Sequence, residues 1–191
     1  MICSLLRIFL KNIKFMSMKS NFFFLKELQR ELKINSEGWK RQIAIVSYRI
    51  KFYFVYINAS KIGLFFAKLL SYFLDFVSQS RSLPGNIFIG YGLIIPHGFN
   101  NVFITEKATL GNDITLFHNV TLGVSNLKEK NKTKIIIGNN VMIGCGTTIL
   151  GKCSIGNNVT IGSNSFLINQ NISENSTVIA PVSKVKKTIK S

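Results

Sequence analysis

The sequence contains few of the residues that cross-link a chain or hold metals. Its three cysteines, Cys3, Cys145 and Cys153, have neither metal-site spacing nor the pattern of a disulfide framework. Such thiols suit a reducing compartment, so we expect a cytoplasmic protein. No uncharged apolar run reaches about 18 residues, so no segment is predicted to span a bilayer. Basic residues interrupt the first 15 positions, which therefore lack the apolar core of a signal peptide.

Acidic residues are also scarce. There are 8 Asp+Glu against 24 Lys+Arg, which gives a net charge of +16. This charge is compatible with nucleic acid, an anionic membrane surface or a phosphorylated ligand. Lysine outnumbers arginine by 19 to 5, and no motif of a nucleic-acid-binding module occurs. We therefore expect no nucleic-acid partner.

The most regular feature is an aliphatic residue at every sixth position between residues 110 and 167. The positions are Leu110, Leu116 and Leu122, and after a break Ile137, Ile143, Ile149, Ile155, Ile161 and Leu167. Neither a helix, with period 3.6, nor a strand, with period 2, produces this spacing. A six-residue repeat is typical of a parallel β-helix, in which three repeats make one coil and successive coils stack about 4.8 Å apart. Glycine and asparagine recur at the expected corners because they tolerate positive φ.

Residues 1–83 differ in composition from the repeats. The first 80 residues hold 2 of the 14 glycines and 11 of the 16 phenylalanines. The pattern predicts helices over 25–32 and 43–76, broken near 35–38, so the whole chain should be mainly β with N-terminal helices. We expect the helices to pack on the β-helix or on another subunit; a basic, aromatic surface could instead rest on the inner face of a membrane. The predicted domains are 1–83, 84–182 and a basic tail, 183–191.

Winding the repeats in threes brings the two histidines together. Once the insertions before Ile104 and after Leu122 are removed, Ile95, Leu116, Ile143 and Ile161 share one face. The residues two positions later form a column at one corner: His97, His118, Cys145 and Ser163. The equivalent column on another face contains Tyr91, Asn112, Asn139 and Asn157, which is ordinary turn chemistry. The only two imidazoles of the chain should therefore lie about one strand spacing apart.

These residues resemble a known family. The IPHG segment at His97, the LFHNVTLG segment at His118, and the repeats from IGNNVMIGCG onward are similar to serine acetyltransferases and related hexapeptide acyltransferases, over about residues 84–182. The resemblance implies a left-handed β-helix, an exception to the usual right-handed crossover. It also implies a homotrimer that binds acetyl-CoA between subunits and has its catalytic histidine at His97. From the cysteine spacing and the two histidines we expect no metal.

The same comparison shows where the chain departs from the family. Serine acetyltransferases carry Asp before this histidine, where the chain has Pro96, and an Arg-His pair in the following loop, where 125–134 has lysines and Glu129. Ser82 stands near the place of the acid that orients the histidine. Because the residues that hold serine are missing, we expect a sugar or surface-polysaccharide precursor as acceptor. Serine, in cysteine biosynthesis, is the alternative.

The resemblance and the column together assign roles. His97 would be the general base and then the general acid. His118 would bias the tautomer or the pKa of His97, or contact the acceptor. Gly123 could supply N–H groups to an oxyanion. The groove for acetyl-CoA would be lined by Gly144, Cys145, Gly162 and Ser163, with Cys145 as a small filler and not a nucleophile.

A non-catalytic β-helix is the competing interpretation. A zinc enzyme on this scaffold needs three histidine ligands, and the chain has two. Regular ranks of threonine, which an ice-binding surface requires, are absent. The sequence therefore favours an acyltransferase over a scaffold.

Overall fold

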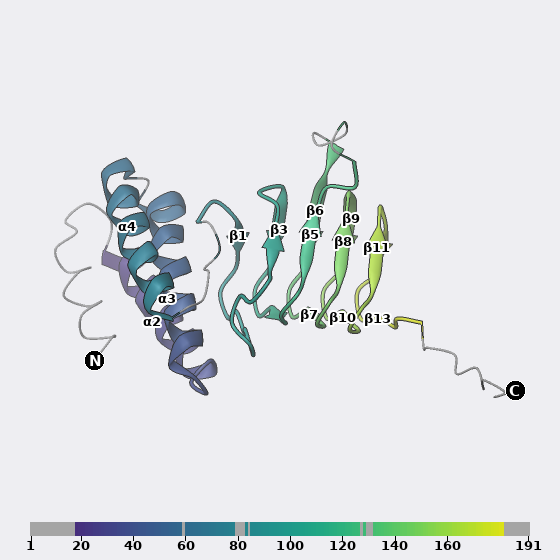
Figure 1. The fold of residues 1–191 in the computed structure, drawn as a ribbon, viewed down its shortest axis with the longest axis horizontal. Coiled ribbons are helices and arrows are strands. Elements are labelled where there is room, and N and C mark those ends of the chain that lie inside the picture. The colour runs from purple at the N-terminus through teal and green to yellow at the C-terminus, as the bar shows by residue number, and fades with distance from the viewer. Residues whose placement is uncertain are drawn as a thin grey trace, which may run out of the picture.

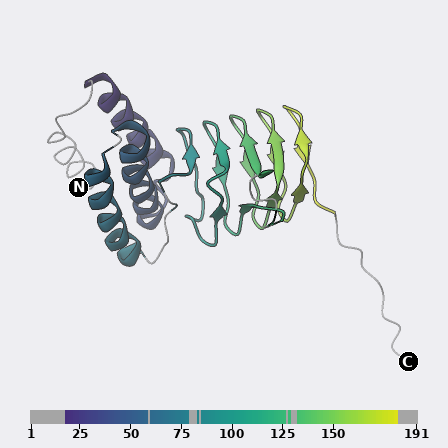
Figure 2. The same ribbon diagram turned by 90° about the horizontal axis from the view of Figure 1, so that it is seen from above.

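Helices occupy one end of the molecule and a stack of short strands the other (Figures 1 and 2). The computed structural model describes residues 18–58, 60–78, 83, 85–126, 128 and 132–181. Within these residues the helical segments are α2 (Met18–Ile34), α3 (Trp39–Phe52), the π-helix η1 (Tyr53–Ile57) and α4 (Lys61–Ser78). The first 17 residues, Ser82 and the basic tail 183–191, on which expectations were placed above, lie outside the described residues.

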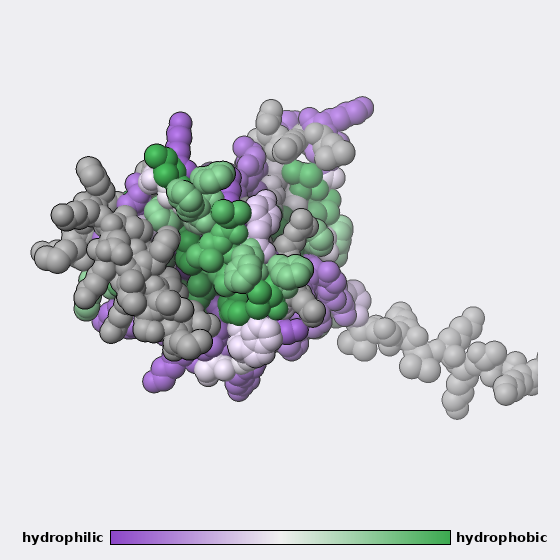
Figure 3. All heavy atoms as spheres, turned by 60° about the vertical axis from the view of Figure 1, so that its left-hand side comes forward, coloured by the Kyte–Doolittle hydropathy of each residue, from purple (hydrophilic) through white to green (hydrophobic). Residues whose placement is uncertain are grey.

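The helix predicted over 43–76 is two helices, which corrects the sequence-based boundary. The helical path leaves regular geometry through η1 and ends near Asn58, and α4 begins at Lys61. The Ser60 hydroxyl accepts a hydrogen bond from the Gly63 N–H at 3.0 Å, as a residue that caps a helix start does. The sequence carried this signal, but the continuous apolar run around it masked the break. Hydrophobic side chains of the helical end remain at the surface in Figure 3.

The strands form three parallel sheets, one on each face of a prism. The first sheet contains β1 (Phe88–Ile89), β3 (Ala108–Leu110), β6 (Lys134–Ile137), β9 (Lys152–Ile155) and β12 (Asn171–Ile172). The second contains β4 (Thr115–Leu116), β7 (Met142–Ile143), β10 (Thr160–Ile161) and β13 (Thr177–Val178). The third contains β2 (Phe103–Ile104), β5 (Thr121–Gly123), β8 (Thr148–Leu150) and β11 (Phe166–Ile168). The first corner joins the first sheet to the second, and the second corner joins the second sheet to the third. The third corner joins the third sheet to the first sheet in the next coil.

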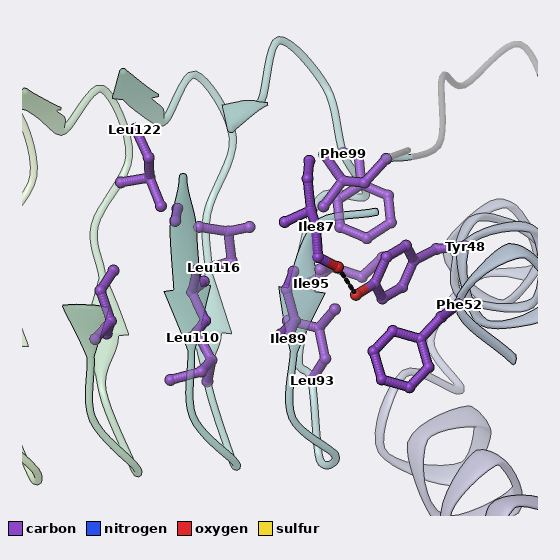
Figure 4. Close-up of a cluster of buried hydrophobic side chains, with 14 of the residues drawn as sticks. Tyr48, Phe52, Ile87, Ile89, Leu93, Ile95, Phe99, Leu110, Leu116 and Leu122 are labelled. Carbon is purple, nitrogen blue, oxygen red and sulfur yellow. Dashed lines mark hydrogen bonds between the residues drawn. The ribbon is translucent and has the colours of Figure 1, made fainter. Parts of the chain in front are cut away.

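Strand pairing confirms the predicted six-residue repeat. Leu110 pairs with Ile137, one coil later in the first sheet, and Leu116 pairs with Ile143 in the second. These aliphatic side chains are buried and point into the prism, where they form a continuous core with their counterparts in neighbouring coils (Figure 4). Parallel pairing between coils satisfies the backbone groups that such a core would otherwise leave unpaired.

The corners show two separate reasons for glycine and asparagine. Three residues after the inward aliphatic, the backbone has positive φ at the second corner of every coil: Gly98, Asn119, Gly146 and Asn164. One residue after the aliphatic, Gly144 is needed for a different reason, because a Cβ there would lie 2.6 Å from the backbone nitrogen of Ser163. The sequence-based explanation, positive φ alone, therefore covers only part of the pattern.

The helices join the first coil through a fully buried ion pair. The side chains of Arg49 (α3) and Glu31 (α2) are 0% exposed. Arg49 donates to the Ile89 carbonyl at 2.8 Å and to the Gly90 carbonyl at 2.6 Å, and Glu31 accepts from the Leu93 N–H at 2.9 Å. Burial alone would lower the pKa of Arg49, but the Glu31 carboxylate outweighs it and the pKa is raised. The network satisfies backbone groups of the first coil that have no preceding coil to pair with.

Two further side chains extend this junction. The Asn35 amide donates to the Leu93 carbonyl and its oxygen accepts from the Ile95 N–H, both at 2.9 Å. The Tyr48 hydroxyl donates to the Ile87 carbonyl at 2.8 Å, as Figure 4 shows, and burial raises the pKa of Tyr48. The segment that leads to His97 is thus held on one side by helices and on the other by the second coil.

Candidate active site

The two histidines lie side by side at the second corner. His97 follows Ile95 in the first coil and His118 follows Leu116 in the second. Their Nδ1 atoms are 2.6 Å apart and their ring centroids 4.6 Å apart. The predicted juxtaposition is therefore present in the structure. It arises because each ring occupies the same position of its coil, two residues after a buried aliphatic side chain.

The short contact between two Nδ1 atoms restricts the protonation of the pair. One Nδ1 must carry the hydrogen and the other must present its lone pair. If His97 donates, its Nε2 is left unprotonated and can accept a proton from a substrate. The same hydrogen bond becomes charge-assisted when His97 is protonated, as the bond to a carboxylate does in other catalytic pairs.

Two residues that the sequence did not point to contact His97. The Asn100 amide donates to the His97 carbonyl at 2.7 Å. The Phe117 ring packs edge-on to the His97 ring with centroids 5.8 Å apart. Phe117 could have been found from its place directly before His118, at the corner, whereas Asn100 lies in an insertion with no counterpart in other coils.

The column continues through the next two coils as predicted. The His118 carbonyl accepts from the Gly146 N–H at 3.2 Å, and the Cys145 thiol donates to the Ser163 hydroxyl at 3.3 Å. The Gly144 and Gly162 N–H groups donate to carbonyls of the following coil, each at 2.8 Å, so both are already used by the fold. These two glycines can line a groove, but they have no free N–H to offer an oxyanion.

Gly123 does not join the histidines within one chain. It ends β5, so it lies across the width of the third sheet from the second corner. The insertion at 125–134 follows it at the third corner, where residues 125, 126, 128 and 132–134 are described. A hollow of about 330 Å³ there is lined by Ser125, Lys132 and Lys152, among others. The single chain therefore separates the predicted base from the predicted oxyanion donor.

A larger hollow of about 710 Å³ lies between α4 and the first coil. Its walls include Lys51, Leu64, Phe99 and Val102, but neither histidine. The His97 side chain is exposed, so the second corner is an open edge in the single chain. Among the described residues, no group of three or more His, Cys, Asp or Glu is placed to hold a metal ion. No helix in the described part of the chain is long and apolar enough to cross a membrane.

The repeats are similar to those of known proteins. Residues 134–169 match the family model described as bacterial transferase hexapeptide (six repeats). The coils of the second half of the β-helix thus carry the hexapeptide repeat of this class of transferases. A serine acetyltransferase of Helicobacter pylori is 36% identical over 120 residues, which cover 63% of this chain and 68% of that protein. A serine acetyltransferase of Bacillus subtilis is 32% identical over 141 residues, or 74% of this chain and 58% of its own length.

Solved structures agree with the sequence relatives. Neisseria gonorrhoeae serine acetyltransferase in complex with serine is 29% identical, with a TM-score of 0.64, over 88% of this chain and 71% of that one. Serine acetyltransferase isoform 3 of Entamoeba histolytica, in complex with cysteine, has a TM-score of 0.69 at 24% identity and shares the fold over 90% of this chain and 63% of its own. The chain belongs to the serine acetyltransferase family.

This membership confirms several expectations from the sequence. The fold is a left-handed parallel β-helix preceded by helices, and the enzyme class is an acetyltransferase that uses acetyl-CoA. The relatives are serine acetyltransferases by name, so the comparisons favour serine as the acceptor. The sugar acceptor, which we expected because the residues that hold serine in the family are missing, is less well supported. The chain spans about two thirds of the H. pylori relative and less of the B. subtilis one.

Proposed function

We propose that His97 is the general base for direct transfer of an acetyl group from acetyl-CoA to a hydroxyl. The observation that carries this assignment is the 2.6 Å contact between the Nδ1 atoms of His97 and His118. It leaves Nε2 of His97 able to take the hydroxyl proton as the oxygen attacks the thioester carbonyl. The tetrahedral intermediate then collapses, the carbon–sulfur bond breaks, and the proton passes from His97 to the leaving thiolate.

His118 acts in this scheme as a positioning residue. Its Nδ1 accepts the hydrogen bond that fixes the His97 ring and selects the tautomer with a free Nε2. It also stabilises the imidazolium that forms during proton transfer. A neutral imidazole thereby replaces the acid that orients the histidine in the family, near whose place the sequence has Ser82.

The column below the histidines would hold the pantetheine arm of acetyl-CoA. Gly144 and Gly162 leave the corner without side chains, and Cys145 and Ser163 add two small polar groups beside them. The Cys145 thiol contacts no base among the described residues, which supports direct transfer without an acyl-cysteine intermediate. Gly123 and the 125–134 loop would complete the site from a neighbouring subunit of a homotrimer, because in one chain they lie at another corner.

Serine is the acceptor that the relatives support, and we propose it first. A sugar hydroxyl is the second candidate, and a specific feature favours it. Pro96 precedes the base and can offer no carboxylate to a substrate ammonium group, and the 125–134 loop contains no arginine to pair with a carboxylate. A sugar has neither charge and would not need these partners.

Acceptor competition tests both the chemistry and its substrate. Thiol release from acetyl-CoA should be measured with the full chain, without acceptor and with L-serine, D-serine and a panel of hexoses and aminosugars. The proposal expects release that depends on an acceptor, with L-serine at least tenfold faster than D-serine. Brisk turnover with a sugar and none with serine would shift the assignment to the second candidate. No turnover with any acceptor would contradict the enzymatic function.

A further inference from the structure

Helix α4 turns its small residues, together with Leu64 and Leu74, inward and its phenylalanines outward. It contacts α3 and η1. Ala67 and Ser71 are buried, and the Ser71 hydroxyl donates to the Ser47 carbonyl of α3 at 3.1 Å. Gly63 leaves no room for a side chain, since a Cβ there would lie 2.3 Å from the Phe54 ring. The helix therefore packs on the rest of the chain through small residues and two leucines, and its phenylalanines are left outside that contact, which an ordinary amphipathic surface helix would bury.

The outward side of α4 is a continuous apolar surface, which we call the α4 apolar face. Six of its side chains are more than half exposed: Ile62 (74%), Phe65 (64%), Phe66 (56%), Leu69 (59%), Phe73 (63%) and Phe76 (82%). Figure 3 turns the helical end forward and shows hydrophobic side chains gathered there in one patch. Exposed patches of this kind mark contacts with a protein or a membrane.

The exposed charges of helix α4 are all positive. Lys61 and Lys68 are exposed, while Asp75 is half-buried and accepts a hydrogen bond from the Ser47 hydroxyl at 3.0 Å. Tyr72, 74% exposed, adds an aromatic ring with a polar tip. Lys68 and Tyr72 also line the hollow of about 710 Å³, so they stand at the edge of the α4 apolar face, which presents apolar rings bordered by cations and no exposed carboxylate of its own helix.

We propose that the α4 apolar face rests on an anionic phospholipid surface. Phenylalanine and leucine side chains would enter the boundary between headgroups and acyl chains, and Tyr72 would lie at headgroup depth. Lys61 and Lys68 can bury their aliphatic stems and hold their ammonium groups against lipid phosphates. Lysine is depleted in protein interfaces relative to the rest of the surface, so an apolar face bordered by lysines favours lipid over a second copy of the chain. This contact is independent of the acceptor identity.

Vesicle flotation with the full chain tests the contact. The probes are phosphatidylcholine vesicles that contain or lack phosphatidylglycerol. The wild type should float with the anionic vesicles, less so with neutral ones, and less at high salt. Phe65→Gln, Phe73→Gln and Phe76→Gln together should reduce binding at least tenfold. Lys61→Gln with Lys68→Gln should reduce binding to anionic vesicles about tenfold and leave the weak binding to neutral ones unchanged.

A matched control separates this face from general exposed hydrophobicity. Phe166→Gln with Ile179→Gln removes side chains that are 61% and 79% exposed on the β-helix, and vesicle binding should be unaffected. All variants should retain wild-type circular dichroism and turnover with a soluble acceptor.

Three outcomes would overturn the proposal. In the first, the wild type does not prefer anionic vesicles. In the second, the triple phenylalanine variant binds vesicles normally, or deletion of residues 1–17 alone abolishes binding. In the third, light scattering shows that the triple variant loses a subunit contact instead of a lipid contact, which would assign the face to a second copy.

Discussion

The two ends of the molecule are stabilised in different ways. In the β-helix the same contact recurs from coil to coil: Leu116 packs on Ile143 and Ile143 on Ile161, each in parallel pairing. Among the described residues of the helical end no contact repeats, and the junction is built from the buried pair of Arg49 and Glu31 together with Asn35 and Tyr48. A periodic core spreads its stability over many equivalent positions, whereas the junction concentrates it in one polar network.

The candidate chemistry lies next to the boundary between these ends. His97 belongs to the first coil, whose outer backbone groups are held by helices, and His118 belongs to the second coil, held on both sides by strands. One imidazole is therefore positioned partly by the unique junction and its partner by the repeat. Variants on each side can separate the two contributions.

Removal of the proposed base should have the largest effect. His97→Asn keeps a polar side chain at the corner but cannot take a proton, so kcat/KM for acetyl transfer should fall about 10²- to 10⁴-fold. Thermal unfolding should change little, because the ring is exposed. Thiol release from acetyl-CoA measures kcat/KM, and circular dichroism measures thermal unfolding. Retention of more than a tenth of wild-type turnover would exclude His97 as the base.

Arg49→Ala should cause the largest loss of stability. It leaves the Glu31 carboxylate buried without its partner, which costs about 3–5 kcal/mol of unfolding free energy. The double variant Arg49→Met and Glu31→Leu should recover only part of this loss, because it removes both charges but leaves the Ile89 and Gly90 carbonyls and the Leu93 N–H without their side-chain partners. Urea unfolding followed by circular dichroism measures both. A single-variant cost below about 1 kcal/mol would show that the junction does not depend on this pair.

A core truncation in the repeat should cost about as much unfolding free energy as Arg49→Ala, or slightly less. Ile143→Ala removes a fully buried side chain from the second sheet and should cost about 2–5 kcal/mol. Met142→Ala, one residue earlier and 39% exposed, is the matched control and should cost no more than about 0.5 kcal/mol. Equal costs at the two positions would contradict the inward–outward alternation.

Loss of the positioning histidine should have a moderate effect on rate. His118→Ala removes the acceptor for the His97 Nδ1–H and should lower kcat about tenfold, with little change in KM for acetyl-CoA. His118→Asn places an amide oxygen near the former Nδ1 and should restore part of the loss. A structural role alone would affect both variants through stability and would not separate kcat from KM. Full activity of His118→Ala would remove the pair from the mechanism.

The smallest effect is expected at the first corner. The Asn139 side chain accepts from the Asn112 N–H at 2.8 Å, and Asn157 accepts from the Asn139 N–H at 2.7 Å, so the amides form a ladder along the stack. Asn139→Ala removes one such bond and should cost about 0.5–1.5 kcal/mol in urea unfolding. The cost should be similar for Asn157→Ala, since the ladder repeats. A several-fold difference between the two would contradict an equivalent role.

The sequence predicted much of the β-helix because a repeat reports the geometry of neighbouring coils directly. The six-residue spacing of Ile137, Ile143 and Ile149 determined which side chains point inward. Two histidines at the same position of successive coils then had to be neighbours, whatever the details of the corners. The same reasoning misjudged glycine, because a close approach such as that at Gly144 depends on the next coil and not on the local φ.

Other features were decided by the tertiary structure, because no period connects the segments involved. Arg49 and Gly90 are 41 positions apart, and nothing in either local pattern indicates their hydrogen bond. The direction of the α4 apolar face follows from which side of the helix meets α3, and the sequence showed only that the helix was apolar. The Nδ1–Nδ1 contact of the histidines required the ring orientations. Repeating sequence thus determines repeating structure, while single contacts between unlike segments are chosen only when the chain packs.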